Sequence, residues 1–205
     1  MSKDSLISVV IPVYNEEDSI TANHEALISV LKETERSYEV IYVDDGSKDS
    51  SFSVIEGLIQ NDGKVRAVRF ARNFGQTAAM TAGIEEACGE VIIMMDADGQ
   101  NDAADIPLLL SKIDKGYDVV SGWRHNRQDS WARRIVSSIA NKLISRVTGV
   151  HLHDYGCSLK AYHKDVIKNV RLYGEMHRFI PALASQSGAS IAEVKVGHHR
   201  RNSGK

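Results

Sequence analysis

The chain has 205 residues, of which 42% are hydrophobic and 25% charged, with a formal net charge of −2. This length and composition suit one domain with a sizeable core and exclude a disordered or collagen-like chain. No uncharged apolar run approaches the ~20 residues that cross a bilayer, and no signal peptide opens the chain. The two cysteines, Cys88 and Cys157, are too few for a disulfide framework. We therefore expect a soluble, cytoplasmic protein.

Over the first 120 residues, short apolar runs alternate with amphipathic stretches. The predicted strands are 6–13, 38–43, 65–70, 91–95 and 118–122, and the predicted helices lie near 17–34, 49–61, 76–88 and 103–115. Several strands are continuously apolar, as expected for parallel strands that are covered on both faces. The alternation predicts an α/β fold with a mostly parallel sheet and helices on both faces. Cys88 is expected in the core.

The pattern changes after Trp123. An Arg-rich segment leads into a predicted helix at 131–148, which is followed by a short segment at 154–162, two helical stretches and a strand at 191–196. No repeat or clear linker is visible, so we expect a single domain, 1–205.

The charge is divided along the chain. Residues 1–120 hold 10 Lys and Arg against 22 Asp and Glu, whereas residues 121–205 hold 15 against 5. One interpretation is ordinary solvated surface charge. The other is an acidic half that holds a cation beside a basic half that meets phosphates, a membrane surface or nucleic acid.

Polar residues close the first, second and fourth predicted strands, at 12–16, 44–47 and 96–100. Each segment alone is typical of a turn. In open parallel sheets, however, ligands sit beyond the carboxyl ends of the strands, so the three segments should converge. Their carboxylates would repel one another unless a cation or hydrogen-bond donors lay between them.

Asp96 and Asp98 are the most informative of these residues. In an extended segment, alternate side chains point the same way, and Gln100 offers a third oxygen. Such ligands suit Mg²⁺ or Mn²⁺, and so sparse a set leaves room for a diphosphate. The Gly-rich phosphate-binding motifs are absent, which weakens the kinase, P-loop and dinucleotide-binding interpretations. We therefore predict a metal–nucleotide site.

The motifs PVYNE (12–16), VDDGS (43–47) and DADGQ (96–100) resemble, in this order and spacing, the family 2 inverting glycosyltransferases of the GT-A fold. NRQDSW (126–131) and DYGC (154–157) are similar to the polyisoprenyl-phosphate glycosyltransferases, such as dolichol-phosphate mannosyltransferase and the undecaprenyl-phosphate glucosyl- and aminoarabinosyltransferases. The resemblance covers nearly the whole chain. It does not identify one sugar.

The resemblance implies roles at matching positions. The implied nucleotide-binding residues are Pro12, Tyr14, Glu16, Val43, Asp45, Asp96, Ala97 and Asp98. Asp98 and Gln100 would bind the Mg²⁺ or Mn²⁺ ion. Phosphate or acceptor contacts are implied for Arg124, Arg127, His177, Arg178 and Arg201. Asp154 would be the catalytic base or would orient the acceptor, and Cys157 is expected to be buried near the site without acting as a nucleophile.

The implied reaction moves a sugar from a nucleotide-sugar donor to a polyprenyl (undecaprenyl or dolichyl) phosphate, with inversion. UDP-hexose is the first choice of donor and GDP-mannose the second. A phosphate monoester has a second pKa of ~6, so the acceptor needs positioning more than deprotonation. Residues 1–120 would form the nucleotide- and metal-binding half, and residues 121–205 the acceptor-side half.

The basic half predicts peripheral contact with the inner face of a membrane. Family members usually continue into an amphipathic segment, and many continue into transmembrane helices. Because this chain does not, we expect a catalytic domain, a fragment, or a form that relies on a homo-oligomer or a membrane subunit.

Other functions remain possible from the sequence. The nearest is a family 2 transferase with a saccharide or protein acceptor, for which a true base at Asp154 would matter more. A second is a non-catalytic regulatory subunit that binds nucleotide sugars. A sugar nucleotidyltransferase normally has a Gly-rich loop after its first strand, which is missing here. Nucleic acid is disfavoured because few aromatic residues lie among the arginines.

Overall fold

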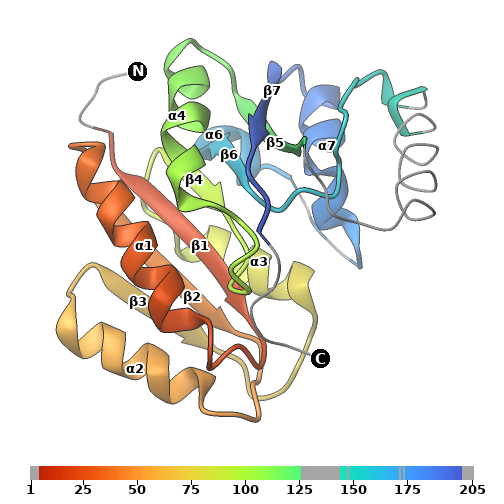
Figure 1. The fold of residues 1–205 in the computed structure, drawn as a ribbon. Coiled ribbons are helices and arrows are strands. Elements are labelled where there is room, and N and C mark those ends of the chain that lie inside the picture. The colour runs from red at the N-terminus through yellow and green to blue at the C-terminus, as the bar shows by residue number, and fades with distance from the viewer. Residues whose placement is uncertain (1–4, 126–143, 147, 171, 173, 200–205) are drawn as a thin grey trace.

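The computed structural model describes residues 5–125, 144–146, 148–170, 172 and 174–199. Its described strands form one sheet in the order β3-β2-β1-β4-β6-β5-β7 (Figure 1). The strands are β1 (Ile7–Val13), β2 (Tyr38–Asp44), β3 (Val65–Arg69), β4 (Val91–Met94), β5 (Val119–Arg124), β6 (Lys160–His163) and β7 (Ile191–Val196). The parallel pairs are β1 with β2, β1 with β4, β2 with β3, and β5 with β7. The predicted mostly parallel sheet is confirmed.

Helices cover both faces of this sheet. They are α1 (Ile20–Glu33), α2 (Ser51–Asn61), α3 (Gln76–Glu86), α4 (Ile106–Asp114), α6 (Lys164–Ile167) and α7 (Ile180–Gln186), with short 3₁₀ turns η1 (Ala103–Asp105) and η2 (Met176–Phe179). α1, α2 and α4 share one apolar cluster with Val9, whereas α3, α6 and α7 share another with Val10. β1 contributes to both clusters, because successive strand side chains point to opposite faces and all seven of its residues are buried.

β6 is the strand that the sequence analysis missed. It lies antiparallel between β4 and β5, with Lys160 opposite Met94 and Ser121. We expected only a short segment at 154–162, since four residues are too few for a clear periodicity. Because β6 runs antiparallel to β4, the 154–159 segment that precedes β6 lies near the carboxyl end of β4. The predicted helix at 131–148 lies mostly outside the described residues, which are helical at 144–146 and 148.

The expectation for Cys88 was wrong, because its side chain is exposed. α3 ends at Glu86, and Ala87 is already extended, so the helical spacing that pointed Cys88 inward has stopped. Cys157 is fully buried, as expected.

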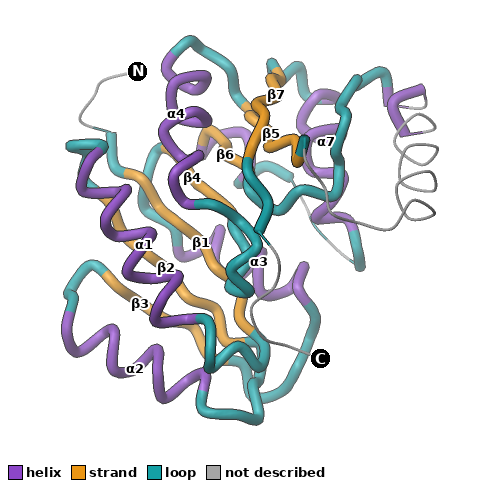
Figure 2. The backbone as a smooth tube through the Cα atoms, viewed as in Figure 1, coloured by secondary structure: helices purple, strands orange, loops and turns teal. Residues whose placement is uncertain are grey.

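The carboxyl ends of β1, β2 and β4 meet at one edge of the sheet, because the three strands run parallel. Figure 2 shows the loops that follow these strands gathered at this edge. Within the described residues, no helix is both long enough and apolar enough to cross a membrane.

Candidate active site

A pocket of about 420 Å³ lies at this edge. Its lining includes these predicted nucleotide-binding residues: Pro12, Tyr14, Glu16, Asp45, Asp96, Ala97 and Asp98. The structure therefore brings side chains from three separate strand ends to one cavity. Val43 does not line the pocket: its side chain is fully buried in the core near Val10, two residues before Asp45.

The loops after β1 and β2 are joined by reciprocal hydrogen bonds. The Asn15 N–H donates to Ser47 Oγ at 3.0 Å, and the Lys48 N–H donates to Asn15 Oδ1 at 2.8 Å. Asn15 takes a left-handed φ of 55°, a conformation that asparagine tolerates better than most residues. Gly46 has φ +70°, and a Cβ there would lie 2.4 Å from the Arg72 backbone. Only glycine therefore lets the loop after β3 pass this closely.

That third loop contributes residues that the sequence analysis did not single out: Asn73, Gly75 and Gln76 line the pocket. Asp45 holds the loop, since its carboxylate accepts the N–H groups of Phe74 at 2.7 Å and Gly75 at 2.9 Å. The predicted site includes only the ends of the first, second and fourth strands. The same rule applied to the strand at 65–70 would have found this loop.

The Asp96–Asp98 segment is anchored from α1 and from the chain beyond it. The Ala97 carbonyl accepts hydrogen bonds from Ser19 Oγ at 2.9 Å and Asn23 Nδ2 at 2.7 Å. Asn101 Oδ1 accepts from the Asp96 N–H at 2.9 Å and from Ser158 Oγ at 3.0 Å. These contacts fix the acidic segment against both halves of the sheet.

The surroundings of Asp96 disfavour its ionised form. Burial raises the pKa of its carboxyl group, and the neighbouring Asp98 adds to the rise, while Ser158, Lys160 and Arg124 oppose it. Gln76 Nε2 donates to Asp96 Oδ1 at 2.8 Å. A raised carboxyl pKa means that the negative charge is incompletely compensated, so a cation bound nearby would be favoured.

The oxygens around Asp98 suit a hard cation. Asp98 lines the pocket, and its Oδ1 accepts the Gln100 N–H at 3.0 Å, which brings Gln100 beside it. Among the described residues, no group of three or more His, Cys, Asp and Glu side chains is arranged to enclose a metal. An all-oxygen, sparse donor set fits Mg²⁺ or Mn²⁺ that takes its remaining ligands from phosphates and water.

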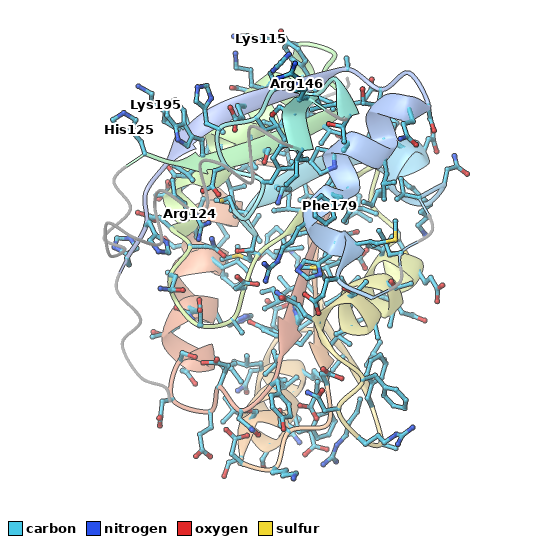
Figure 3. All side chains as sticks on the ribbon, turned by 90° about the vertical axis from the view of Figure 1, so that its right-hand side faces the viewer. Lys115, Arg124, His125, Arg146, Phe179 and Lys195 are labelled. Atoms are coloured by element: carbon cyan, nitrogen blue, oxygen red, sulfur yellow. The ribbon has the colours of Figure 1, made fainter. Side chains whose placement is uncertain are left out.

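Asp154 lies in the segment that leads into β6, and its side chain is paired with Arg124. Arg124 Nε donates to Asp154 Oδ2 at 2.7 Å and Nη2 to Oδ1 at 3.0 Å, a two-pronged pair whose carboxylate is 2% exposed. Figure 3 shows Arg124 near the end of β5, on the same side as Lys195 of β7. Glu193 of β7 accepts the N–H groups of His153 at 2.8 Å and Asp154 at 3.2 Å. Two strands therefore hold the Asp154 segment.

A second cavity, of about 130 Å³, adjoins the first pocket. Gln76 and Asp96 line both cavities. His177 and Arg178 also line the smaller one, as does Lys160, which the sequence analysis did not single out. His177 is buried beside Thr77 Oγ1 at 2.7 Å, and burial lowers the pKa of its ring. Cys157 lines the cavity too, and burial raises the pKa of its thiol to about 11, which makes it a poor nucleophile at neutral pH.

Two predicted phosphate contacts, Arg127 and Arg201, lie outside the described residues. Among the described ones, Arg178 is exposed at the second cavity. The structure thus places the predicted nucleotide side and part of the predicted acceptor side next to each other.

Several known proteins are similar to this chain. Dodecaprenyl-phosphate galacturonate synthase of Rhizobium johnstonii is 45% identical over 203 residues, covering 97% of this chain and 60% of that protein. Undecaprenyl-phosphate 4-deoxy-4-formamido-L-arabinose transferase of Aeromonas hydrophila is 44% identical over 200 residues, covering 97% and 61%. The chain thus spans about three fifths of the length of these curated relatives.

Solved structures share the fold. Glucosyl-3-phosphoglycerate synthase from Mycobacterium tuberculosis, in complex with Mn²⁺, UDP and phosphoglyceric acid, superposes with a TM-score of 0.75 at 18% identity. The match covers 98% of this chain and 72% of that one. The predicted GT-A fold is confirmed. The family model described as Glycosyl transferase family 2 matches residues 8–171. Motifs, fold and relatives agree, and the chain belongs to glycosyl transferase family 2.

Proposed function

We propose that this chain is the catalytic domain of a metal-dependent inverting glycosyltransferase that moves a sugar from a nucleotide diphosphate to a polyprenyl phosphate. The observation that carries the proposal is the pocket in which carboxylates from three strand ends meet. Relatives named as dodecaprenyl- and undecaprenyl-phosphate sugar transferases support the lipid acceptor. A fold neighbour in complex with Mn²⁺ and UDP supports the donor side.

On the donor side, Asp98 and Gln100 would hold the Mg²⁺ or Mn²⁺ ion. When bound, such an ion stabilises negative charge on the departing diphosphate. Pro12, Tyr14 and Glu16 would line the base pocket, and Asp45 would contribute through the loop that it organises. UDP-hexose stays our first choice of donor and GDP-mannose the second.

On the acceptor side, Asp154 orients the acceptor phosphate rather than taking a proton from it. Its close pairing with Arg124 supports this role, because a carboxylate beside a guanidinium is a weak base. A phosphate monoester of second pKa ~6 is already largely ionised at neutral pH, so no strong base is required. Arg127, His177, Arg178 and Arg201 would contact phosphate.

The acceptor is a membrane lipid, so the domain would work at the cytoplasmic face of the membrane. The basic half, 121–205, would make peripheral contact with that surface. A homo-oligomer or a membrane subunit would supply any further attachment.

The test is a transfer assay with undecaprenyl phosphate and a panel of UDP- and GDP-sugars, with Mn²⁺ or with EDTA. We expect an inverted glycosyl-phosphate lipid from donors of one base, and only with the ion. Transfer to a saccharide but not to lipid phosphate would favour the other family 2 reading. Failure to bind, hydrolyse or transfer any donor would contradict the proposal.

A further inference from the structure

Lys160 is a buried cation beside the candidate active site. It begins β6, is 4% exposed, and is held in register between β4 and β5. Its Nζ donates to the backbone carbonyl of Tyr155 at 3.2 Å and to that of Cys157. Both carbonyls belong to the turn that joins Asp154 to β6. The Lys160 side chain therefore ties this turn to the first residue of β6 by two hydrogen bonds.

Burying an ammonium group is costly unless opposite charge and acceptors surround it. Burial lowers the pKa of Lys160, and the nearby Cys157, Asp154 and Asp96 oppose that effect. Buried ion pairs are weak evidence for stability, because apolar replacements of similar volume are often neutral or stabilising. A gain in stability therefore does not by itself explain why a lysine is buried here to bind the carbonyls of Tyr155 and Cys157.

The turn connects Lys160 to Asp154 by short links. The Gly156 N–H donates to Asp154 Oδ1 at 3.1 Å, in the same turn whose carbonyls Lys160 binds. The cavity of about 130 Å³ is lined by the turn and by Lys160. Without the ammonium group, two buried carbonyls would lose a donor, and the turn would have space into which to relax.

We infer that Lys160 is a positioning residue that holds the 155–157 turn so that the Asp154 carboxylate meets Arg124 beside the donor pocket. The inference rests on the proposed function for its activity readout. Its main effect falls on the Asp154 segment. Because the Lys160 charge also acts on Asp96, which lines the first pocket, nucleotide affinity should fall, but less than kcat.

The experiment compares Lys160→Met and Lys160→Arg with Lys168→Met. Lys168 is the matched control, because its Nζ also donates to two backbone carbonyls, those of Glu85 at 3.3 Å and Ala87 at 2.8 Å, away from both cavities. We expect Lys160→Met to lower kcat by about 10- to 100-fold through misplacement of Asp154, with a clearly smaller loss of nucleotide affinity. Lys160→Arg should recover most of kcat, and Lys168→Met should keep it.

A double variant separates positioning from general damage. If Lys160 acts through Asp154, Lys160→Met combined with Asp154→Asn should be no slower than Asp154→Asn alone. Additive losses, an equal fall in nucleotide affinity, or a wild-type kcat in Lys160→Met would overturn the inference.

A spectroscopic readout does not require turnover. The Arg124 Nε–H resonance in ¹⁵N NMR reports its pairing with Asp154, and it should shift in Lys160→Met but not in Lys168→Met. An unchanged resonance would overturn the inference. If wild type transfers no sugar while this resonance responds as expected, the proposed function fails and the positioning role stands.

Discussion

Asp154 is almost fully buried and shares both carboxylate oxygens with Arg124. Thirty positions separate the two residues, and β5 and the 154–159 turn bring them together. Removing one partner of such a pair leaves the other charge under-compensated in a largely buried site. The same pairing weakens Asp154 as a base and strengthens it as a fixed, oriented charge.

We predict that Asp154→Asn lowers the free energy of unfolding by about 2 kcal/mol, the value of a hydrogen bond to a charged group. Its kcat should fall by about 10- to 100-fold through misorientation. Denaturant titration and the transfer assay measure the two effects. Asp114→Asn is the control, because it breaks the Arg36–Asp114 pair (2.6 Å) at the opposite end of the sheet. That variant should keep its kcat. Complete loss of turnover in folded Asp154→Asn would indicate a true base.

For single residues, the motif resemblance predicted which side chains line the pocket, but it did not predict the contacts that hold them, such as the pair of Asp154 and Arg124. Seven of the predicted nucleotide-binding residues do line one pocket, because motif positions follow strand ends. Val43 belongs to the core, since side chains alternate along β2 and its neighbours cover that face. Lys160 was missed because its role depends on carbonyls three and five residues before it, in a turn with no motif of its own.

Among the elements, α3 packs unusually close to the sheet. A Cβ on Gly83 would lie 2.3 Å from Val10 Cγ1 and 3.1 Å from Val43 Cγ2. The glycine thus lets the helix approach β1 and β2, and α3 begins directly after the loop that carries Asn73 and Gly75 into the pocket. Packing here fixes one wall of the candidate site.

We predict that Gly83→Ala destabilises the protein by about 1–3 kcal/mol, because the added methyl group overpacks the helix–sheet contact. Gly57→Ala is the control: it also lies within a helix, but nothing is within 4 Å of the added Cβ. That variant should stabilise by about 0.5–1 kcal/mol. Thermal unfolding of both variants measures this, and equal effects would show that α3 tolerates a wider spacing.

The parallel strands were predictable because they are short and rich in apolar residues, β4 wholly so, and because polar turns follow them. β6 was not, because four residues carry little pattern and its pairing with β4 and β5 is set by contacts distant in sequence. The ends of α3 and α4 were predicted only to within a few residues, since helix termini depend on local capping rather than on periodicity.

Across the whole molecule, the charge is strongly uneven, with an acidic half at 1–120 and a basic half at 121–205. Both halves contribute to a single sheet, and the second cavity, which residues of both halves line, adjoins the pocket proposed for the donor. Nearby Lys and Arg side chains contribute about 1 kcal/mol each at an anionic membrane surface. This arrangement suits an enzyme with a soluble donor and a lipid acceptor.

We predict weak binding to anionic vesicles that is lost as salt concentration rises, because screening shortens the reach of surface charge. Lys195→Glu, an exposed position in the basic half, should reduce the bound fraction in a sedimentation assay. Lys64→Glu, equally exposed in the acidic half, should not. Equal binding to neutral and anionic vesicles at low salt would contradict the electrostatic basis of the contact, and binding to neither would contradict the contact itself.

The central claim is that Asp98 and Gln100, in the segment after β4, hold one divalent cation against a nucleotide diphosphate in the pocket where three strand ends meet. Calorimetric titration of UDP and GDP into wild type and Asp98→Ala, with and without Mn²⁺, tests it most directly. The account predicts Mn²⁺-dependent affinity for one of the two nucleotides in wild type, and a loss of at least about tenfold in Asp98→Ala, or roughly 1.4 kcal/mol. Unchanged affinity in a folded Asp98→Ala protein, or binding that ignores Mn²⁺, would contradict it.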